Sequence, residues 1–91
     1  MILSFLASSP LRYKELKELS SLSDAVLSKH LKKLIDEKLI CRVIREEDRR
    51  AAYAITSDGV EALRILIETR KRKLTEELME IKRTLRSLKH N

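Results

Sequence analysis

Cysteine, glycine, proline and aromatic residues are scarce in this sequence, and their scarcity excludes several classes of protein. The 91 residues include one Cys, one Gly, one Pro, two Tyr, one Phe and no Trp. A single cysteine excludes an internal disulfide framework and fits a reducing cytosol. One glycine is too few for a phosphate-cradling loop. Three aromatic rings are too few for a platform that stacks single-stranded nucleic acid.

Long apolar runs are also missing. No stretch of 18 apolar residues occurs, so the sequence predicts no membrane-spanning helix. Residues 1–7 carry no basic flank and are too short for a secretory signal. The sequence therefore predicts a cytoplasmic protein.

Catalytic and metal-binding sets are absent from the pattern. The two histidines, His30 and His90, and the single Cys41 have no workable ligand spacing, and no Ser-His-acid or Cys-His set is suggested. We therefore expect no enzyme activity and no cofactor. We expect Cys41 to be a structural thiol rather than a redox sensor. We expect His30 to pack or to contact a phosphate.

The charge of the chain points to an anionic partner. Lys and Arg outnumber Asp and Glu by 20 to 14, which gives a net charge of +6 and a pI near 9.7. Nucleic acid and a membrane surface both suit such a surplus, and charge alone does not choose between them.

The hydrophobic periodicity predicts a mostly helical α+β fold in the order helix, helix, helix, strand, strand, helix. We expect short helices over residues 2–8 and 14–19, with Tyr13, Leu16 and Leu19 pointing inward. Ser23 should cap a third helix over residues 24–37. Strands are expected over residues 40–45 and 51–55, joined by a charged tip at 46–50. Thr56 should cap the last helix, so we divide the chain into a domain over residues 1–56 and a helix over 57–91.

Residues 14–37 have the pattern of a helix-turn-helix, whose second helix enters the major groove of DNA. Leu27, Leu31 and Leu34 form one apolar stripe on that helix, and its opposite face is small near the start and basic farther on. Arginines on the hairpin tip could enter a narrow minor groove. Asp24 could support the helix start or accept from a cytosine amino group. The predicted DNA-binding residues are Ser23, Ala25, Ser28, Lys29, Lys32, Arg45, Arg49 and Arg50.

Alternatives remain open for these segments. The helix pair could be amphipathic without any role in DNA binding, and the tip could be a solvated turn of mixed charge, because Glu46, Glu47 and Asp48 offset its arginines.

Residues 21–34 (SLSDAVLSKHLKKL), followed by 39–42 (LICR), 48–50 (DRR) and 55–59 (ITSDG), resemble the winged helix-turn-helix of MarR-type regulators. The resemblance implies a homodimer that binds a palindromic operator, usually as a repressor. It implies that Ala25, Ser28, Lys29 and Lys32 face the major groove. It also implies that Arg50 faces the minor groove, with Asp48 orienting the wing arginines over residues 45–51.

Two features depart from that family. Lys38 stands where its members usually carry glycine. Many of its members carry extra N-terminal helices that build the dimer and a ligand pocket, whereas this sequence starts almost at the first helix of the DNA-binding domain. The chain is nearer to short archaeal-type and PadR-like regulators, which dimerise through a C-terminal helix, and the resemblance leaves any small-molecule effector unknown.

The last helix carries an apolar stripe with steps of three and four. Its positions are Val60, Leu63, Ile67, Arg70, Leu74, Leu78, Ile81, Leu85 and Leu88. The step from Leu74 to Leu78 is a four-residue stutter in the heptad. A helix of about 50 Å cannot bury this stripe on so small a domain, so we expect a coiled-coil homodimer. The predicted dimerisation residues are Leu63, Ile67, Leu74, Leu78, Ile81, Leu85 and Leu88.

The packing of these helices is open between antiparallel, crossed and parallel arrangements. The helix could also fold back on its own domain. A membrane-surface helix is disfavoured, because the segment after Ser57 holds nearly as many acidic residues as basic ones, six against nine.

The sequence thus predicts a homodimeric, sequence-specific regulator that binds double-stranded DNA. A non-specific architectural DNA-binding protein and a winged-helix module that binds another protein are the alternatives.

Overall fold

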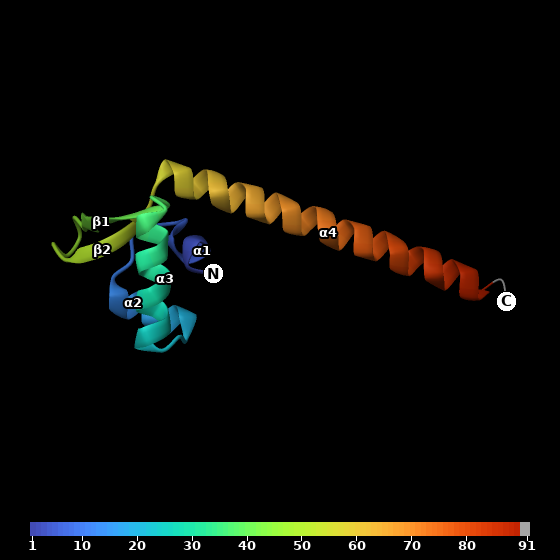
Figure 1. Ribbon diagram of the computed structural model, residues 1–91, viewed down its shortest axis with the longest axis horizontal. Coiled ribbons are helices and arrows are strands. Elements are labelled where there is room, and N and C mark those ends of the chain that lie inside the picture. Colours follow the sequence, from blue (N-terminus) through green and yellow to red (C-terminus); the bar gives the residue numbers. More distant parts are fainter. Residues whose placement is uncertain (90–91) are drawn as a thin grey trace.

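The computed structural model describes residues 1–89 as a small winged domain from which one long helix projects (Figure 1). The elements are α1 (Ile2–Leu6), α2 (Tyr13–Ser20), α3 (Asp24–Asp36), β1 (Ile40–Ile44), β2 (Ala51–Ile55) and α4 (Ser57–Lys89). The molecule measures 65 × 27 × 25 Å, with a radius of gyration of 18.7 Å. A compact chain of this length has a radius of gyration of about 12 Å. Most of α4 therefore lies outside any packed unit.

The core of the domain receives a fully buried side chain from each of four elements. Leu6, Leu16, Leu27 and Ile40 come from α1, α2, α3 and β1. Leu31 of the predicted stripe is buried too, and Leu34 packs against the core from its edge.

Two sequence predictions for this part were wrong. Leu19 is 55% exposed instead of pointing inward. The two-turn α2 extends past the core at its end, and Leu22 from the following turn packs there instead. The first helix ends at Leu6 rather than at Ser8, before the segment that leads to Pro10.

The turn between α2 and α3 is held by backbone conformation and by a cap. Ser21 adopts a left-handed conformation with φ 57°, which ends α2. The Ser23 side chain accepts a hydrogen bond from the Val26 amide at 3.3 Å, as predicted for an N-cap. The cap fixes where α3 starts.

The two strands form an antiparallel hairpin in which Ile40 pairs with Ile55 and Ile44 with Ala51. The tip closes through hydrogen bonds from the Arg45 amide to the Arg50 carbonyl and from the Arg49 amide to the Arg45 carbonyl. Leu11, in the link between α1 and α2, makes a bridge with Tyr53 and ties that link to the hairpin. The hairpin is the predicted wing.

The end of α3 and the start of α4 meet at one junction. Lys38 is left-handed with φ 62°, so it takes the conformation that a glycine would favour there. The Thr56 hydroxyl donates to the Lys38 carbonyl at 2.8 Å and accepts from the Gly59 amide at 3.0 Å, which confirms it as a helix cap. A Cβ atom on Gly59 would lie 2.0 Å from the Leu39 carbonyl oxygen. Only glycine lets α4 pass this close to the turn.

Only the first two turns of α4 pack on the domain. Leu63 is 8% exposed and packs in the core of its own domain, at the point where the predicted dimer stripe meets the winged domain. No helix among residues 1–89 is both long and apolar enough to cross a membrane.

Candidate nucleic-acid interface

The outward face of α3 presents small, polar and basic side chains. Ala25, Ser28, Lys29 and Lys32 are all exposed, while Leu27 and Leu31 on the opposite side are buried. This division comes from the helical period of the sequence. It leaves the start of the outer face free of bulky side chains.

Asp24 fixes the start of α3 against α2. Its Oδ1 accepts a hydrogen bond from the Tyr13 hydroxyl at 2.8 Å, and its Oδ2 lies 2.9 Å from the Lys17 ammonium. The Lys17 hydrogen bond, followed by the one from Tyr13, lowers the pKa of the Asp24 carboxyl, and Asp24 in turn raises the pKa of Lys17. Both carboxylate oxygens are engaged by α2, which favours a bracing role over contact with cytosine.

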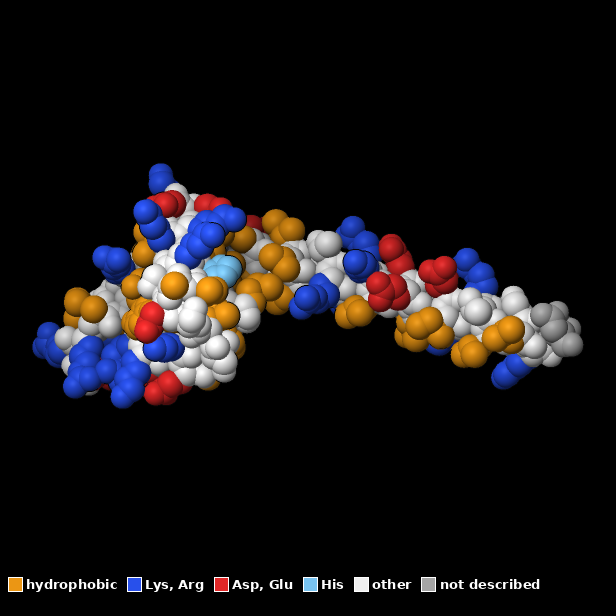
Figure 2. All heavy atoms as spheres, turned by 60° about the horizontal axis from the view of Figure 1, so that its bottom comes forward, with side chains coloured by type: hydrophobic (Ala, Val, Ile, Leu, Met, Phe, Trp, Pro, Cys, Tyr) orange, Lys and Arg blue, Asp and Glu red, His pale blue; other side chains and the backbone are white. Residues whose placement is uncertain are grey.

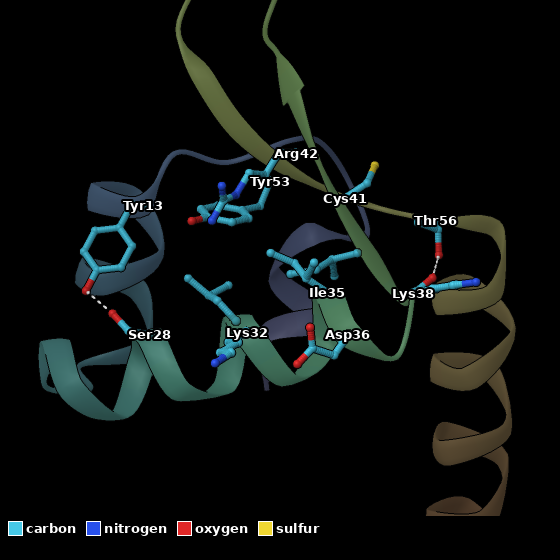
Figure 3. A pocket seen from close by; sticks show the side chains of 12 residues that line it. Tyr13, Ser28, Lys32, Ile35, Asp36, Lys38, Cys41, Arg42, Tyr53 and Thr56 are labelled. Carbon is cyan, nitrogen blue, oxygen red and sulfur yellow. Dashed lines mark hydrogen bonds between the residues drawn. The ribbon is translucent and has the colours of Figure 1, made fainter.

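A groove separates α3 from the wing (Figure 3). Ser28 and Lys32 lie on its α3 side, and Arg42 and Tyr53 lie on its hairpin side. The Arg42 guanidinium carbon is 6.0 Å from the centre of the Tyr53 ring, which orients this arginine beside the groove. Two predicted DNA-binding residues therefore share a channel with a basic side chain that sequence reasoning missed.

The base of the wing is held to α2 by an ion-pair network around Arg45. Its Nη1 donates to Glu15 Oε1 at 2.8 Å, and its Nε donates to Asp48 Oδ1 at 3.2 Å, with a second short hydrogen bond from Nη2 to Asp48 Oδ2. Arg12 adds to this network, because its Nε lies 3.7 Å from Glu15 and 3.8 Å from Asp48. These contacts fix the hairpin relative to the helix-turn-helix.

The network also changes how its members titrate. Hydrogen bonds from Arg45 are the main cause that lowers the pKa of Asp48 to about 2, and Asp48 in turn raises the pKa of Arg45. The backbone amide of Arg12 is the main cause that lowers the pKa of Glu15. Both carboxylates are therefore charged at neutral pH and hold the arginines in place.

The chain was compared with models of known protein families. The family model of the HxlR-like helix-turn-helix matches residues 1–82. The chain belongs to the HxlR-like helix-turn-helix family.

This HxlR-like chain is thus a winged helix-turn-helix protein of a family of DNA-binding transcriptional regulators, which are not typically enzymes. The match does not confirm the MarR-type or PadR-like assignment that the sequence motifs suggested. A comparison with curated proteins finds no match.

The HxlR-like fold separates the predicted wing arginines into two groups. Arg49 and Arg50 are exposed at the tip, where the Asp48 carboxylate accepts from the Arg50 amide at 3.2 Å. Arg45 is different, because its side chain is only 15% exposed and is committed to Glu15 and Asp48. It lies in the predicted wing but positions the hairpin instead of pointing outward.

Basic side chains gather at one end of the HxlR-like domain. Figure 2 shows Lys and Arg side chains clustered at the end of the molecule that holds the hairpin in Figure 1, away from the long helix. Acidic side chains are few on that part of the visible face. A polyanion would be attracted to this end first.

The structure places the two residues, Cys41 and His30, for which the sequence predicted no metal or redox role. Cys41 is free and exposed, and it lines the groove between α3 and the wing. That it is a structural thiol rather than a redox sensor stays a prediction. His30 is exposed on the other side of α3, at a second, mainly apolar groove between α1, α3 and α4. Among residues 1–89 no three His, Cys, Asp or Glu side chains come together as a metal site.

Sequence reasoning missed the bracing residues Tyr13, Lys17, Arg12 and Glu15. Their partners outside α2 and its N-cap lie 7 to 36 residues away along the chain, so no local pattern marks these pairs.

Proposed function

We propose that this chain binds double-stranded DNA sequence-specifically as a homodimer and represses the genes whose operators it occupies. One observation carries the proposal. The small, polar and basic face of α3 lies across a groove from a hairpin that carries two exposed arginines and is braced at its base. A major-groove helix with an adjacent minor-groove wing requires this arrangement.

The roles follow from position. Ala25 and Ser28 lie near the start of α3, where the backbone can approach base edges, and the Ser23 hydroxyl keeps the helix start in place. Lys29 and Lys32 reach either a guanine edge or a phosphate. Arg50, together with its neighbour Arg49, enters the adjacent minor groove.

The groove between α3 and the wing would hold the sugar-phosphate strand. The strand that separates a major groove from its neighbouring minor groove must pass between an α3 in the first and a wing in the second. Lys32 and Arg42 flank that path from its two sides. Phosphate contacts of this kind set the position of the protein and make its affinity depend on salt.

Two copies are needed for a palindromic operator. A two-fold dimer would present two copies of α3 to half-sites about 34–36 Å apart, or a multiple of that spacing. We assign the dimer contact to α4. We place the protein in the cytoplasm and assign no effector to it.

The test is fluorescence anisotropy of the purified protein with genomic duplex fragments, at low and near-physiological salt, with unlabelled competitor DNA. A specific regulator binds a subset of fragments about a thousandfold more tightly than it binds the competitor DNA. Equal binding of all fragments, released as salt rises, would replace the proposal with an architectural DNA-binding protein. No binding even at low salt would replace it with a winged-helix module for a protein partner.

A further inference from the structure

The exposed part of α4 carries an apolar stripe with nothing packed on it. Past Leu63 the large apolar residues of the stripe are each more than half exposed: Ile67 56%, Leu74 58%, Leu78 52%, Ile81 56%, Leu85 53% and Leu88 64%. Figure 2 shows these orange side chains following one side of the projecting helix. A contiguous apolar stripe of this length marks an interaction surface.

The spacing of this stripe is symmetric about Leu74. Counting outward from Leu74, stripe positions occur 4, 7, 11 and 14 residues away in both directions. Arg70 thus corresponds to Leu78, and Ile67 to Ile81. The outer pairs are Leu63 with Leu85 and Val60 with Leu88.

The four-residue stutter makes this symmetry selective. An uninterrupted heptad is symmetric about many points and leaves the register of an antiparallel pair open. Here only a two-fold axis through Leu74 places all nine positions of one helix opposite stripe positions of the other.

We propose that α4 pairs with α4 of a second copy as antiparallel helices, with the two-fold axis at Leu74. The proposal rests on the homodimer of the proposed function and specifies its register. Leu74 faces Leu74 of the partner subunit, and Ile67 faces the partner's Ile81. Arg70 lies opposite the partner's Leu78.

Charge favours this direction over a parallel pair. Arg70 is the one charged residue of the stripe. In a parallel pair it would face Arg70 of the partner subunit, and two like charges would meet inside an apolar contact. In the antiparallel register Arg70 lies opposite the partner's Leu78, and the partner's Glu77 is the residue next to that leucine. The Arg70 guanidinium can therefore reach the carboxylate of the partner's Glu77. The one charged residue of the stripe thereby pairs with a residue of opposite charge.

The ends of the pair meet a surface that suits them. Leu85 and Leu88 reach the level of the partner's Leu63 and Val60, where the stripe merges into the winged domain. Leu63 is already buried there, but an apolar groove opens beside it. Its apolar lining consists of Met1, Ile2, Leu3, Phe5, Leu22, Leu34, Leu39, Ala62 and Leu66. The C-terminal leucines of one copy can therefore be covered by the domain of the other.

Disulfide cross-linking tests the register. In a Cys41→Ser background, which removes the exposed native thiol, single variants Leu74→Cys, Ile67→Cys and Ile81→Cys are oxidised separately and as mixtures. We expect Leu74→Cys to cross-link with itself. Ile67→Cys and Ile81→Cys should cross-link only with each other. Glu76→Cys, on the opposite side of the helix, is the control and should stay uncross-linked.

The other outcomes overturn the register in distinguishable ways. If each stripe variant cross-links with itself and the mixture gives no mixed pair, the helices are parallel. If no variant cross-links although sedimentation shows a dimer, the dimer uses another surface. If sedimentation shows only monomer, both this pairing and the homodimer of the proposed function fail. Anisotropy on DNA, measured on the same samples, reports independently whether the DNA-binding part of the proposed function stands.

A charge reversal gives a second readout that does not depend on thiols. Arg70→Glu should raise the dimer dissociation constant about tenfold, because two ion pairs per dimer become repulsive. Arg70→Glu combined with Glu77→Arg should restore it. These residues are seven apart on one helix, so recovery must come from contact between copies. Failure of the double variant to recover would overturn the register.

Discussion

Gly59→Ala tests whether the junction between the winged domain and α4 is as tight as the structure indicates. Gly59 lies in the first turn of α4, and its backbone angle is not left-handed. At an ordinary helical position, alanine in place of glycine stabilises a helix by about 1 kcal/mol. Helix propensity alone therefore predicts a more stable protein.

The contacts predict the opposite sign. The new methyl group would lie 2.0 Å from the Leu39 carbonyl oxygen and 2.7 Å from Ile55 Cγ1. The Leu39 carbonyl cannot easily move, because it accepts a hydrogen bond from the Thr56 amide at 3.0 Å. Overpacking of this kind costs about 1–3 kcal/mol or more. A 2.0 Å approach to a backbone atom belongs at the upper end of that range, so after the propensity gain we expect a net loss of about 2 kcal/mol, or a Tm lower by about 8–16 °C.

Thermal unfolding followed by circular dichroism at a fixed protein concentration measures the effect, since dimerisation makes Tm depend on concentration. Ser57→Ala, an exposed position in the same turn, is the matched control and should leave Tm nearly unchanged. A Gly59→Ala protein with an unchanged or higher Tm would refute the close approach of α4 to Leu39.

Four further predictions concern the interface and its supports. Lys29→Ala should weaken operator binding by about 1–3 kcal/mol if Lys29 reads a base, or weaken all sequences alike if it meets a phosphate; unchanged anisotropy titrations at low salt would remove it from the interface. Arg50→Ala should reduce the slope of log affinity against log salt by about one; a wild-type slope would show that the wing tip does not touch DNA. Lys38→Gly should stabilise the protein by about 0.5–1 kcal/mol, because it relieves a left-handed lysine at φ 62°, whereas Lys38→Ala should not; denaturant unfolding compares the two. The Asp48 carboxyl should titrate with a pKa of about 2 in an NMR titration, because Arg45 holds its charged form. Its folded pKa lies below the ordinary 3.8, so its contribution to wing stability is present above about pH 4 and is lost as pH falls toward 2. An ordinary titration midpoint would mean that the Arg45 pair does not form.

The elements with strong local signals were predictable from the sequence. Ser23 and Thr56 both act as the helix caps that their side chains suggested. The periodicity of residues 24–37 located α3, and the β-branched run from Ile40 located β1, each with its end misplaced by one residue. Caps and periodic stripes depend on neighbours within four residues, so the sequence displays them directly.

Features that depend on distant partners were not predictable. Leu63 has the same spacing as the exposed residues of its stripe, and only the position of the domain buries it. Arg45 looks like the other wing arginines, but Glu15, 30 residues earlier, draws its guanidinium inward. Leu19 fits the inward pattern of α2 but lies where that short helix leaves the core. In each case tertiary packing, not local pattern, decides exposure.

The junction at Thr56 makes α4 a lever on the recognition helix. The Thr56 hydroxyl links the turn that ends α3 to the first turn of α4, and the close approach of Gly59 to Leu39 restricts movement between the two segments. A tilt of about 5° at this point displaces the far end of a helix of about 50 Å by about 4 Å. Whatever holds the far ends of two such levers therefore also sets the angle at which the two recognition helices point.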